Sequence, residues 1–179
     1  MWRKFPITQI GELAITSTRL AVLCSLLLWL LFALLGIFVF ELALGTAVFG
    51  GLLATLLHWL SSLLHQLGHA WAARRTDYPM REIRLLHVLS TSIYPRDEPS
   101  LPAEIHIKRA LGGPPVSMLL GLIGLGVGLA IGDGGGLWYL LAIFFGLENL
   151  LVFGLGAFIP LGFTDGSTLL EWWPKRGRA

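Results

Sequence analysis

Charge is scarce in this sequence, and cysteine is almost absent. Charged residues make up 13% of its 179 residues and hydrophobic residues 55%, whereas an ordinary soluble domain carries about 25% charged residues. The single cysteine, Cys24, cannot form an intrachain disulfide and provides no zinc-finger pattern. No basic stripe interleaved with aromatic residues is present, which argues against a nucleic-acid partner. The length fits one domain, and no repeat of the solenoid type is visible.

The few charges leave two stretches of the chain nearly uncharged. Only Glu41 interrupts residues 20–73, and only Asp133 and Glu148 interrupt residues 110–164. Apolar stretches of this length cannot all be buried inside so small a soluble protein, so they require lipid as solvent. Because about 20 apolar residues cross the hydrocarbon core as a helix, each stretch is expected to be a hairpin of two spans.

The expected fold is a single membrane domain over residues 1–179, all-α with a small β element. Glycine-rich breaks separate the spans within each hairpin. The predicted spans are residues 20–42, 49–73, 116–131 and 137–159. A cleavable signal peptide is the alternative for the first span, but this apolar run is too long and has no small-residue cleavage site.

The basic residues predict the orientation in the membrane. All 13 lysines and arginines flank the two hairpins, and none lies in the loops within them. Loops rich in lysine and arginine stay in the cytoplasm. We therefore expect a multi-pass protein of the cell membrane with both termini and the central segment cytoplasmic. These residues are Arg3, Lys4, Arg19, Arg74, Arg75, Arg81, Arg84, Arg96, Lys108, Arg109, Lys175, Arg176 and Arg178.

Two segments outside the regular spans are distinctive. Residues 80–94 are rich in isoleucine, leucine and valine and partly alternate with charged residues, which predicts a short membrane-associated β-hairpin between the second and third spans. The last span is interrupted at Pro160 and Gly162, and a half-helix over residues 165–173 follows. Irregular backbone at membrane depth is tolerated only where it is buried in protein or lines a wet cavity. Asp165 at this break therefore marks a candidate site.

A second candidate feature lies on the second span, in the segment His65-Gln66-Leu67-Gly68-His69. Histidines at positions i and i+4 share one face of a helix, so both imidazoles can reach one metal ion. Catalytic zinc takes three protein ligands of this kind and keeps one position for water. Asp165 offers a third ligand.

A depth calculation supports the convergence of these residues. His65 lies nine residues before the interfacial Arg74, and Asp165 lies ten before Lys175. At about 1.5 Å per helical residue, both sit about 14 Å inside the cytoplasmic boundary. Ionisable groups inside spans are functional candidates by default.

These segments resemble the site-2 protease family, the intramembrane zinc metalloproteases, over nearly the whole chain. The family pairs a His-Glu-x-x-His motif with a later Asn-x-x-Pro-x-x-x-Leu-Asp-Gly motif, which residues 65–69 and 157–166 resemble. Residues 110–114 are similar to the family's Ala-Gly-Pro segment, and residues 80–94 stand where it has membrane-associated strands. No PDZ-like insertion is present, so the chain resembles a minimal form.

The resemblance implies a function and a site. His65, His69 and Asp165 would be the zinc ligands, and the position of the general-base glutamate is occupied by Gln66. The substrate would be a single-span transmembrane protein or peptide, bound as an added strand on residues 80–94. Asn149 resembles a second asparagine of the family that contacts substrate.

The sequence departs from the family at three places. A glutamine cannot accept the proton that the glutamate removes from water, a step that typically contributes about 10²–10⁴-fold. Gln66 should therefore leave zinc binding intact and make the chain weakly active or inactive. Ala157 replaces the motif asparagine, and Leu89-Ser90-Thr91 stands where a glycine pair is common.

Several alternatives stay open at this level. Gln66 is either natural or an engineered change that traps substrate. The chain could be a non-catalytic pseudoprotease that binds transmembrane segments, with or without zinc, or a haem or metal carrier that uses His58, His65 and His69. Glu148 could serve the site as a base, but its depth favours a pairing with His58 instead.

Overall fold

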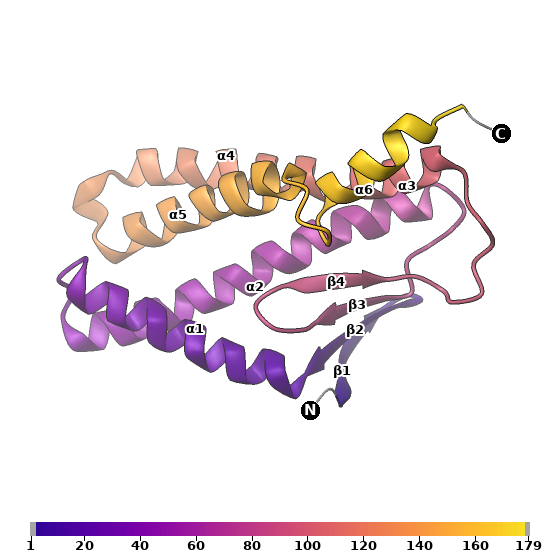
Figure 1. Ribbon diagram of the computed structural model, residues 1–179. Helices are drawn as coiled ribbons and strands as arrows, with labels where there is room; N and C mark the ends of the chain where they lie inside the picture. Colours follow the sequence, from indigo (N-terminus) through magenta and orange to yellow (C-terminus); the bar gives the residue numbers. More distant parts are fainter. Residues whose placement is uncertain (1–2, 178–179) are drawn as a thin grey trace.

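The computed structural model describes residues 3–177, so Arg178 lies outside the described part. In that part, four helices are long and apolar enough to cross a membrane, and a four-stranded sheet is the only β element. This confirms the predicted class, a membrane all-α fold with a small β element (Figure 1). The candidate spans are Arg19–Phe38, Leu44–Arg74, Ala103–Ile131 and Leu137–Phe158.

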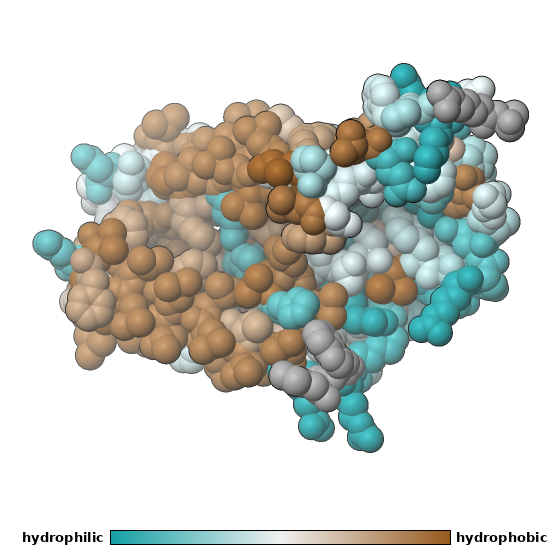
Figure 2. All heavy atoms as spheres, in the orientation of Figure 1, coloured by the Kyte–Doolittle hydropathy of each residue, from teal (hydrophilic) through white to brown (hydrophobic). Residues whose placement is uncertain are grey.

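The helices turn apolar side chains outward, as expected for a protein whose solvent is lipid. Only 17% of the most apolar window of helix α1 (Arg19–Phe38) is buried inside the protein. Figure 2 shows hydrophobic side chains gathered over the long helices and hydrophilic ones at the end that carries the sheet. A soluble protein of this size does not expose so large a contiguous apolar surface. The chain is a multi-pass membrane protein.

Helix α2 (Leu44–Arg74) is the central element, in contact with every other long helix (Figure 1). Its 31 residues span about 46 Å, more than the roughly 30 Å of the hydrocarbon core. Its close packing on α1 depends on Gly51, where a Cβ atom would lie 2.7 Å from the backbone nitrogen of Ala33. The buried face of α2 carries polar side chains as well as small ones, and these form the site described below.

The second hairpin contains the irregular segments. Helix α3 (Ala103–Ala110) is short and leads into helix α4 (Gly113–Ile131), which has Pro114 and Pro115 in its first turn, where the missing amide protons cost nothing. Helix α4 thus begins a little before residue 116, the predicted start of the third span, and the candidate span extends back through α3 to Ala103.

The last span is broken, as predicted (Figure 1). Helix α5 (Leu137–Leu147) widens into a π-helix, η2 (Glu148–Leu155), and a 3₁₀ turn, η3 (Gly156–Phe158). Residues 159–164 are not helical, and helix α6 (Asp165–Trp172) continues into a second 3₁₀ turn, η4 (Trp173–Lys175).

The sheet corrects one prediction. Strands β3 (Glu82–Leu85) and β4 (Ser90–Ile93) form the expected hairpin, but strands β1 (Lys4–Ile10) and β2 (Leu13–Thr18) were not expected. The strand order is β1-β2-β3-β4, with β2 parallel to β3 and the other pairs antiparallel. The first two strands escaped prediction because β2 completes its pairing with a strand that lies beyond the first two spans.

A buried carboxylate holds three strands together. Glu82 of β3 accepts hydrogen bonds from Lys4 Nζ (2.8 Å), Thr16 Oγ1 (2.6 Å) and Arg84 Nε (2.8 Å). Burial by itself raises the pKa of Glu82, but these three donors outweigh it and lower the pKa to about 2. The charged side chain of Glu82 therefore links β3 to β1 and β2.

Candidate metal centre

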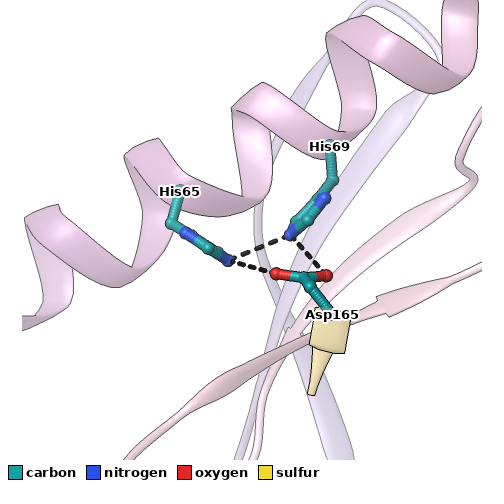
Figure 3. A group of neighbouring side chains, drawn as sticks. All are labelled: His65, His69 and Asp165. Carbon is teal, nitrogen blue, oxygen red and sulfur yellow. Dashed lines mark hydrogen bonds and ion pairs between the residues drawn. The ribbon is translucent and has the colours of Figure 1, made fainter. Parts of the chain in front are cut away.

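Three potential metal ligands meet between helices α2 and α6 (Figure 3). The Nε2 atoms of His65 and His69 lie 2.9 Å apart. Asp165 places Oδ2 3.4 Å from the Nε2 of His65 and Oδ1 3.4 Å from the Nε2 of His69. One ligand atom from each residue lies within 4.8 Å of the others. The structure thus brings together the three residues that the sequence proposed as ligands.

The outer nitrogens of both histidines are held by other helices. His65 Nδ1 lies 3.0 Å from the hydroxyl of Ser117 in α4, and His69 Nδ1 donates to the carbonyl oxygen of Arg109 at 2.8 Å. A partner at Nδ1 orients the ring, as is usual for histidines that bind metals. Metal binding through both Nε2 atoms would place the ring protons on Nδ1, where the carbonyl of Arg109 and the hydroxyl of Ser117 can accept them.

The spacing of these atoms fits a zinc ion. Ligands at about 2.0–2.1 Å in a tetrahedral arrangement are separated by about 3.3 Å. The two nitrogen-to-oxygen distances of 3.4 Å match this value, and the nitrogen pair at 2.9 Å is somewhat closer. Two imidazoles and one carboxylate are also the donor set of catalytic zinc sites that keep a position for water.

Asp165 reaches the histidines because the chain folds tightly just before it. Thr164 donates its hydroxyl to the carbonyl of Ile159 at 2.5 Å and accepts from the amide of Leu161 at 3.2 Å. Gly162 has φ +88°, a backbone conformation that residues other than glycine rarely adopt. These bonds fold residues 159–164 into a tight loop. Helix α6 therefore begins at Asp165, and the carboxylate of Asp165 faces α2.

A glycine permits the close packing of the two imidazoles. Gly113 begins α4 beside both rings, and a Cβ atom there would lie 2.6 Å from the Nε2 of His65. Gly68 plays the same part on α2, since a Cβ atom there would lie 2.5 Å from the carbonyl oxygen of Gly112. The junction of α3 and α4 can therefore lie directly against the histidine face of α2.

Gln66, at the predicted general-base position, is bound to strand β4. Its Nε2 donates to the backbone carbonyl of Ser90 at 3.0 Å, and its Oε1 accepts from the hydroxyl of Ser92 at 2.6 Å. Both ends of the amide are thus satisfied by one strand. The first bond needs an N–H donor, which a carboxylate lacks.

A cavity of about 620 Å³ opens over the three ligands. One side is formed by β4 and the opposite side by apolar residues of the broken last span. The buried guanidinium of Arg109 supports its rim, since it is paired with Glu98 at 2.5 Å and lies over the ring of Tyr94. Burial raises the pKa of Tyr94 to about 12, so this phenol stays protonated. The apolar lining residues of the last span are Val152, Phe153, Ala157, Ile159, Leu161 and Phe163.

Asn149, proposed as a substrate contact, points elsewhere. It is fully buried and donates to the hydroxyl of Ser61 at 2.7 Å and to the carbonyl of Phe145 at 2.9 Å. It is not among the residues that line the cavity. A contact between Asn149 and substrate stays a prediction.

His58 and Glu148 pair with each other inside the membrane. His58 Nδ1 lies 2.6 Å from Glu148 Oε1, and His58 Nε2 lies 2.6 Å from the carbonyl oxygen of Val88. The ring of Phe153 stands between His58 and His65, at 5.9 and 5.8 Å from the two imidazole centroids. This arrangement separates the pair from the metal ligands and agrees with the pairing expected from depth.

Sequence reasoning missed the residues that support the ligands. Ser117, Ser90 and Ser92 are single hydroxyl residues in no recognisable pattern, and Arg109 acts on His69 through its backbone. Two of them carried a signal: Arg109 as a basic residue at the edge of a span, and Ser90 as part of the segment that departs from the family's glycine pair. Contacts of this kind depend on which helices pack together, which a local pattern does not reveal.

The comparisons with known proteins agree with this fold. No protein-family model and no curated protein matches the sequence. Among solved structures, the chain is similar to the site-2 protease from Methanocaldococcus jannaschii, with a TM-score of 0.67 and 19% sequence identity, over 99% of this chain and 74% of that chain. At this identity the likeness establishes architecture, and it spans the whole described arrangement of helices and sheet. The chain therefore has the fold of a site-2 protease.

Proposed function

We propose that this chain is a zinc-binding intramembrane metalloprotease scaffold for single-span transmembrane substrates, weakly active or inactive because of Gln66. The observation that carries the proposal is the convergence of His65, His69 and Asp165 from two separate elements of a membrane protein with this fold. Interhelical hydrogen bonding alone would not require two Nε2 atoms and a carboxylate to face one point.

Each residue would have a defined task. The Nε2 atoms of His65 and His69 and one oxygen of Asp165 would hold zinc, which polarises a peptide carbonyl and activates a water molecule. Gln66 lies one residue from the first histidine and can orient a polar group by hydrogen bonding. Its amide cannot take a proton, so general-base catalysis worth about 10²–10⁴-fold is missing.

The cavity suits an extended apolar segment. Strand β4 is at the edge of the sheet and lines the cavity beside the ligands. Side chains of α2 bind the backbone groups of Ser90, so main-chain pairing with a substrate strand would use the part of β4 after Ser90. The apolar wall opposite fits side chains taken from a transmembrane helix. We therefore propose transmembrane proteins or peptides as partners, with the lipid bilayer as the medium.

The proposal includes a location, the cell membrane, with both termini and the central segment in the cytoplasm. Strand β2 pairs with β3, and α3 contacts α6, so the segments before, between and after the two helical hairpins gather on one side. The excess of lysine and arginine in these segments supports the cytoplasmic side.

Metal analysis of the purified chain tests the proposal. Protein in detergent should contain one zinc per chain, and His65→Ala, His69→Ala and Asp165→Ala should each reduce zinc affinity by more than about tenfold. His87→Ala, a histidine change outside the cluster, serves as the matched control. Absence of zinc at every pH tested, or full retention of zinc in the three variants, would overturn the proposal.

The second candidate function is a pseudoprotease that binds transmembrane segments without cleaving them. The observation in its favour is the fit of Gln66 as an amide, with one donor bond to Ser90 and one acceptor bond from Ser92. Both candidates predict a substrate cavity, and the pseudoprotease would bind its partner with or without zinc. They differ in what a carboxylate at position 66 would do.

A further inference from the structure

Helix α2 is joined to strand β4 and to the turn before it by polar contacts at regular intervals. His58 meets Val88 in the turn, Ser62 meets Ser90, and Gln66 meets Ser90 and Ser92. The helix positions are four residues apart, and their partners are two residues apart in the sequence. We call this set of three contacts the polar zipper.

The spacing of the zipper follows from the geometry of the two elements. Four helical residues rise about 6.0 Å, and two strand residues rise about 6.6 Å. From residue 62 to residue 66, α2 therefore advances about 6.0 Å, close to the step of about 6.6 Å from Ser90 to Ser92 in β4, while His58 reaches Val88 in the turn before the strand. One polar group per helical turn can meet one strand position after another without strain.

The middle contact is the densest. The hydroxyls of Ser62 and Ser90 lie 2.5 Å apart, the amide of Ser90 donates to Ser62 Oγ at 3.2 Å, and Ser90 Oγ lies 3.2 Å from the Ser62 carbonyl. The side-chain amide of Gln66 donates to the backbone carbonyl of Ser90. Both backbone groups of Ser90 are thus bound by α2 side chains, which replace a neighbouring strand at this point of the sheet edge.

The first contact explains why an ionisable pair lies in the membrane. The carbonyl of Val88 only accepts hydrogen bonds, so His58 Nε2 carries a proton, and the 2.6 Å contact between His58 Nδ1 and Glu148 requires one further proton. His58 and Glu148 together then have no net charge. Glu148 also fixes the ring so that Nε2 faces β4.

Discrete hydrogen bonds set a register, whereas apolar packing tolerates sliding. A slip of β4 by two residues would move it about 6.6 Å along α2 and leave these buried polar groups without partners. A buried polar contact that selects one register is the best-attested structural use of such groups. Residues 90–92 of β4 line the same cavity as His65 and Asp165, so the register decides which part of the strand lies beside the metal ligands.

We propose that His58 and Ser62 are positioning residues that fix β4 in one register along α2, with Glu148 holding His58 in place. The register of β4 sets where the sheet edge meets the metal-binding cavity. If the proposed function holds, it also sets which peptide bond of a paired substrate strand reaches the ligands. That consequence rests on the proposed function, while the register itself does not.

Disulfide trapping measures the register directly. The test protein carries Cys24→Ser together with three new cysteines, Ser62→Cys, Ser90→Cys and Ser92→Cys. The thiol at position 62 can then form a disulfide with position 90, its partner in the native register, or with position 92, its partner after a slip of two residues. The ratio of 62–92 to 62–90 products, measured by mass spectrometry after oxidation, reports the register. This background lacks the three serine hydroxyls but keeps the contacts of His58 with Val88 and of Gln66 with the carbonyl of residue 90, so the 62–90 product should still dominate, and its absence would overturn the proposal.

The variant His58→Leu/Glu148→Leu removes the first contact without leaving an unpaired carboxylate in the membrane. The ratio of 62–92 to 62–90 products should rise about fivefold, which corresponds to the net free energy that one hydrogen bond contributes. Thr55→Val removes a buried hydroxyl of α2 that bonds only to Gly51 within the helix, so it should leave the ratio unchanged. Equal ratios in the double variant and in Thr55→Val would refute the positioning role.

Two further variants keep the test decisive. Glu148→Gln should preserve the ratio, because its amide can still donate to His58 Nδ1 and leave Nε2–H on Val88. If the double leucine variant does not fold, Gln66→Leu removes the third contact and should raise the ratio by a similar factor, and an unchanged ratio would again refute the zipper. Zinc content separates the two proposals: a parent chain without zinc overturns the proposed function but leaves the ratio interpretable.

Discussion

Gln66 donates its side-chain amide to the backbone carbonyl of Ser90 at 3.0 Å. A glutamate at the same position would place a carboxylate against that carbonyl, with no proton to share. The surrounding structure therefore accepts an amide at the position proposed for the general base. The same side chain holds strand β4 against α2, so one substitution tests both the proposed catalytic role and the structural one.

Gln66→Glu should raise zinc-dependent cleavage of a model transmembrane peptide by about 10²–10⁴-fold, because it supplies the missing proton acceptor. The same change should lower stability by about 1–3 kcal/mol, since the carbonyl of Ser90 loses its donor. Cleavage is followed by mass spectrometry in detergent with added zinc, and stability by thermal unfolding.

The matched control for this experiment is Gln66→Leu, which removes both hydrogen bonds of the amide and supplies no base. It should lose stability without any gain in cleavage. If the glutamate and leucine variants cleave equally slowly while both retain zinc, the pseudoprotease function is the correct one.

Gly113→Ala should reduce zinc affinity by about 10–100-fold, the range seen when the surroundings of metal ligands are disturbed. The added methyl group would lie 2.6 Å from His65 Nε2 and must push the ring aside. Gly126→Ala, on the same helix with nothing within 4 Å of the new atom, should bind zinc normally. Competition with a zinc chelator measures both, and equal affinities would show that the packing of Gly113 is irrelevant to the site.

Ser117→Ala should weaken zinc binding without unfolding the protein. The change removes the hydroxyl 3.0 Å from His65 Nδ1, and with it a hydrogen bond that orients the ring, for which a loss of zinc affinity of about 10–100-fold is typical. Ser25→Ala removes a hydroxyl of α1 that lies outside the cluster and should have no effect on zinc. An unchanged zinc affinity in Ser117→Ala would mean that the ring orientation is set by packing alone.

The sheet should lose stability in acid through Glu82. Its pKa in the folded protein is about 2, below the ordinary value of 4.5. A lowered folded-state pKa adds stability that is fully present above the unfolded value and is lost as the pH falls from about 4.5 toward 2. Between pH 5 and pH 2.5, the melting temperature should therefore fall further for the native chain than for Glu82→Gln. An equal fall in the two proteins would show that Glu82 does not cause the loss of stability.

Hydropathy and charge were sufficient to predict the helical part of the fold. The scarcity of charge over residues 20–73 and 110–164 indicated that these stretches lie in lipid, and glycine-rich breaks predicted that each stretch forms two spans. The break at Pro160 and Gly162 was also visible, because both residues interrupt a helix wherever they occur.

The sheet and the π-helix were less accessible to sequence reasoning. Residues 4–18 contain β-branched residues around a turn at Gly11, but their partner strand begins at Glu82. Non-local pairing of this kind leaves little local signal. The widening of the last span at Glu148 arises where its polar side chains meet α2, so it depends on packing between helices.

Within the candidate site, spacing predicted the ligands and depth predicted the pairing of His58 with Glu148. The supporting contacts of Ser117, Ser90 and Arg109 could not be predicted, because each depends on how two distant segments are aligned. Sequence identified which groups are costly to bury, and the structure identified what satisfies them.

The parallel pairing of β2 with β3 constrains how the protein is made. During synthesis β2 leaves the ribosome first, but Glu82, which pairs with Ala14, emerges only after both α1 and α2 have been translated. A two-stranded hairpin is at best marginally stable in water. The N-terminal strands therefore lack their partner until the first two helices have been synthesised, and the sheet can close only after that helical hairpin is complete.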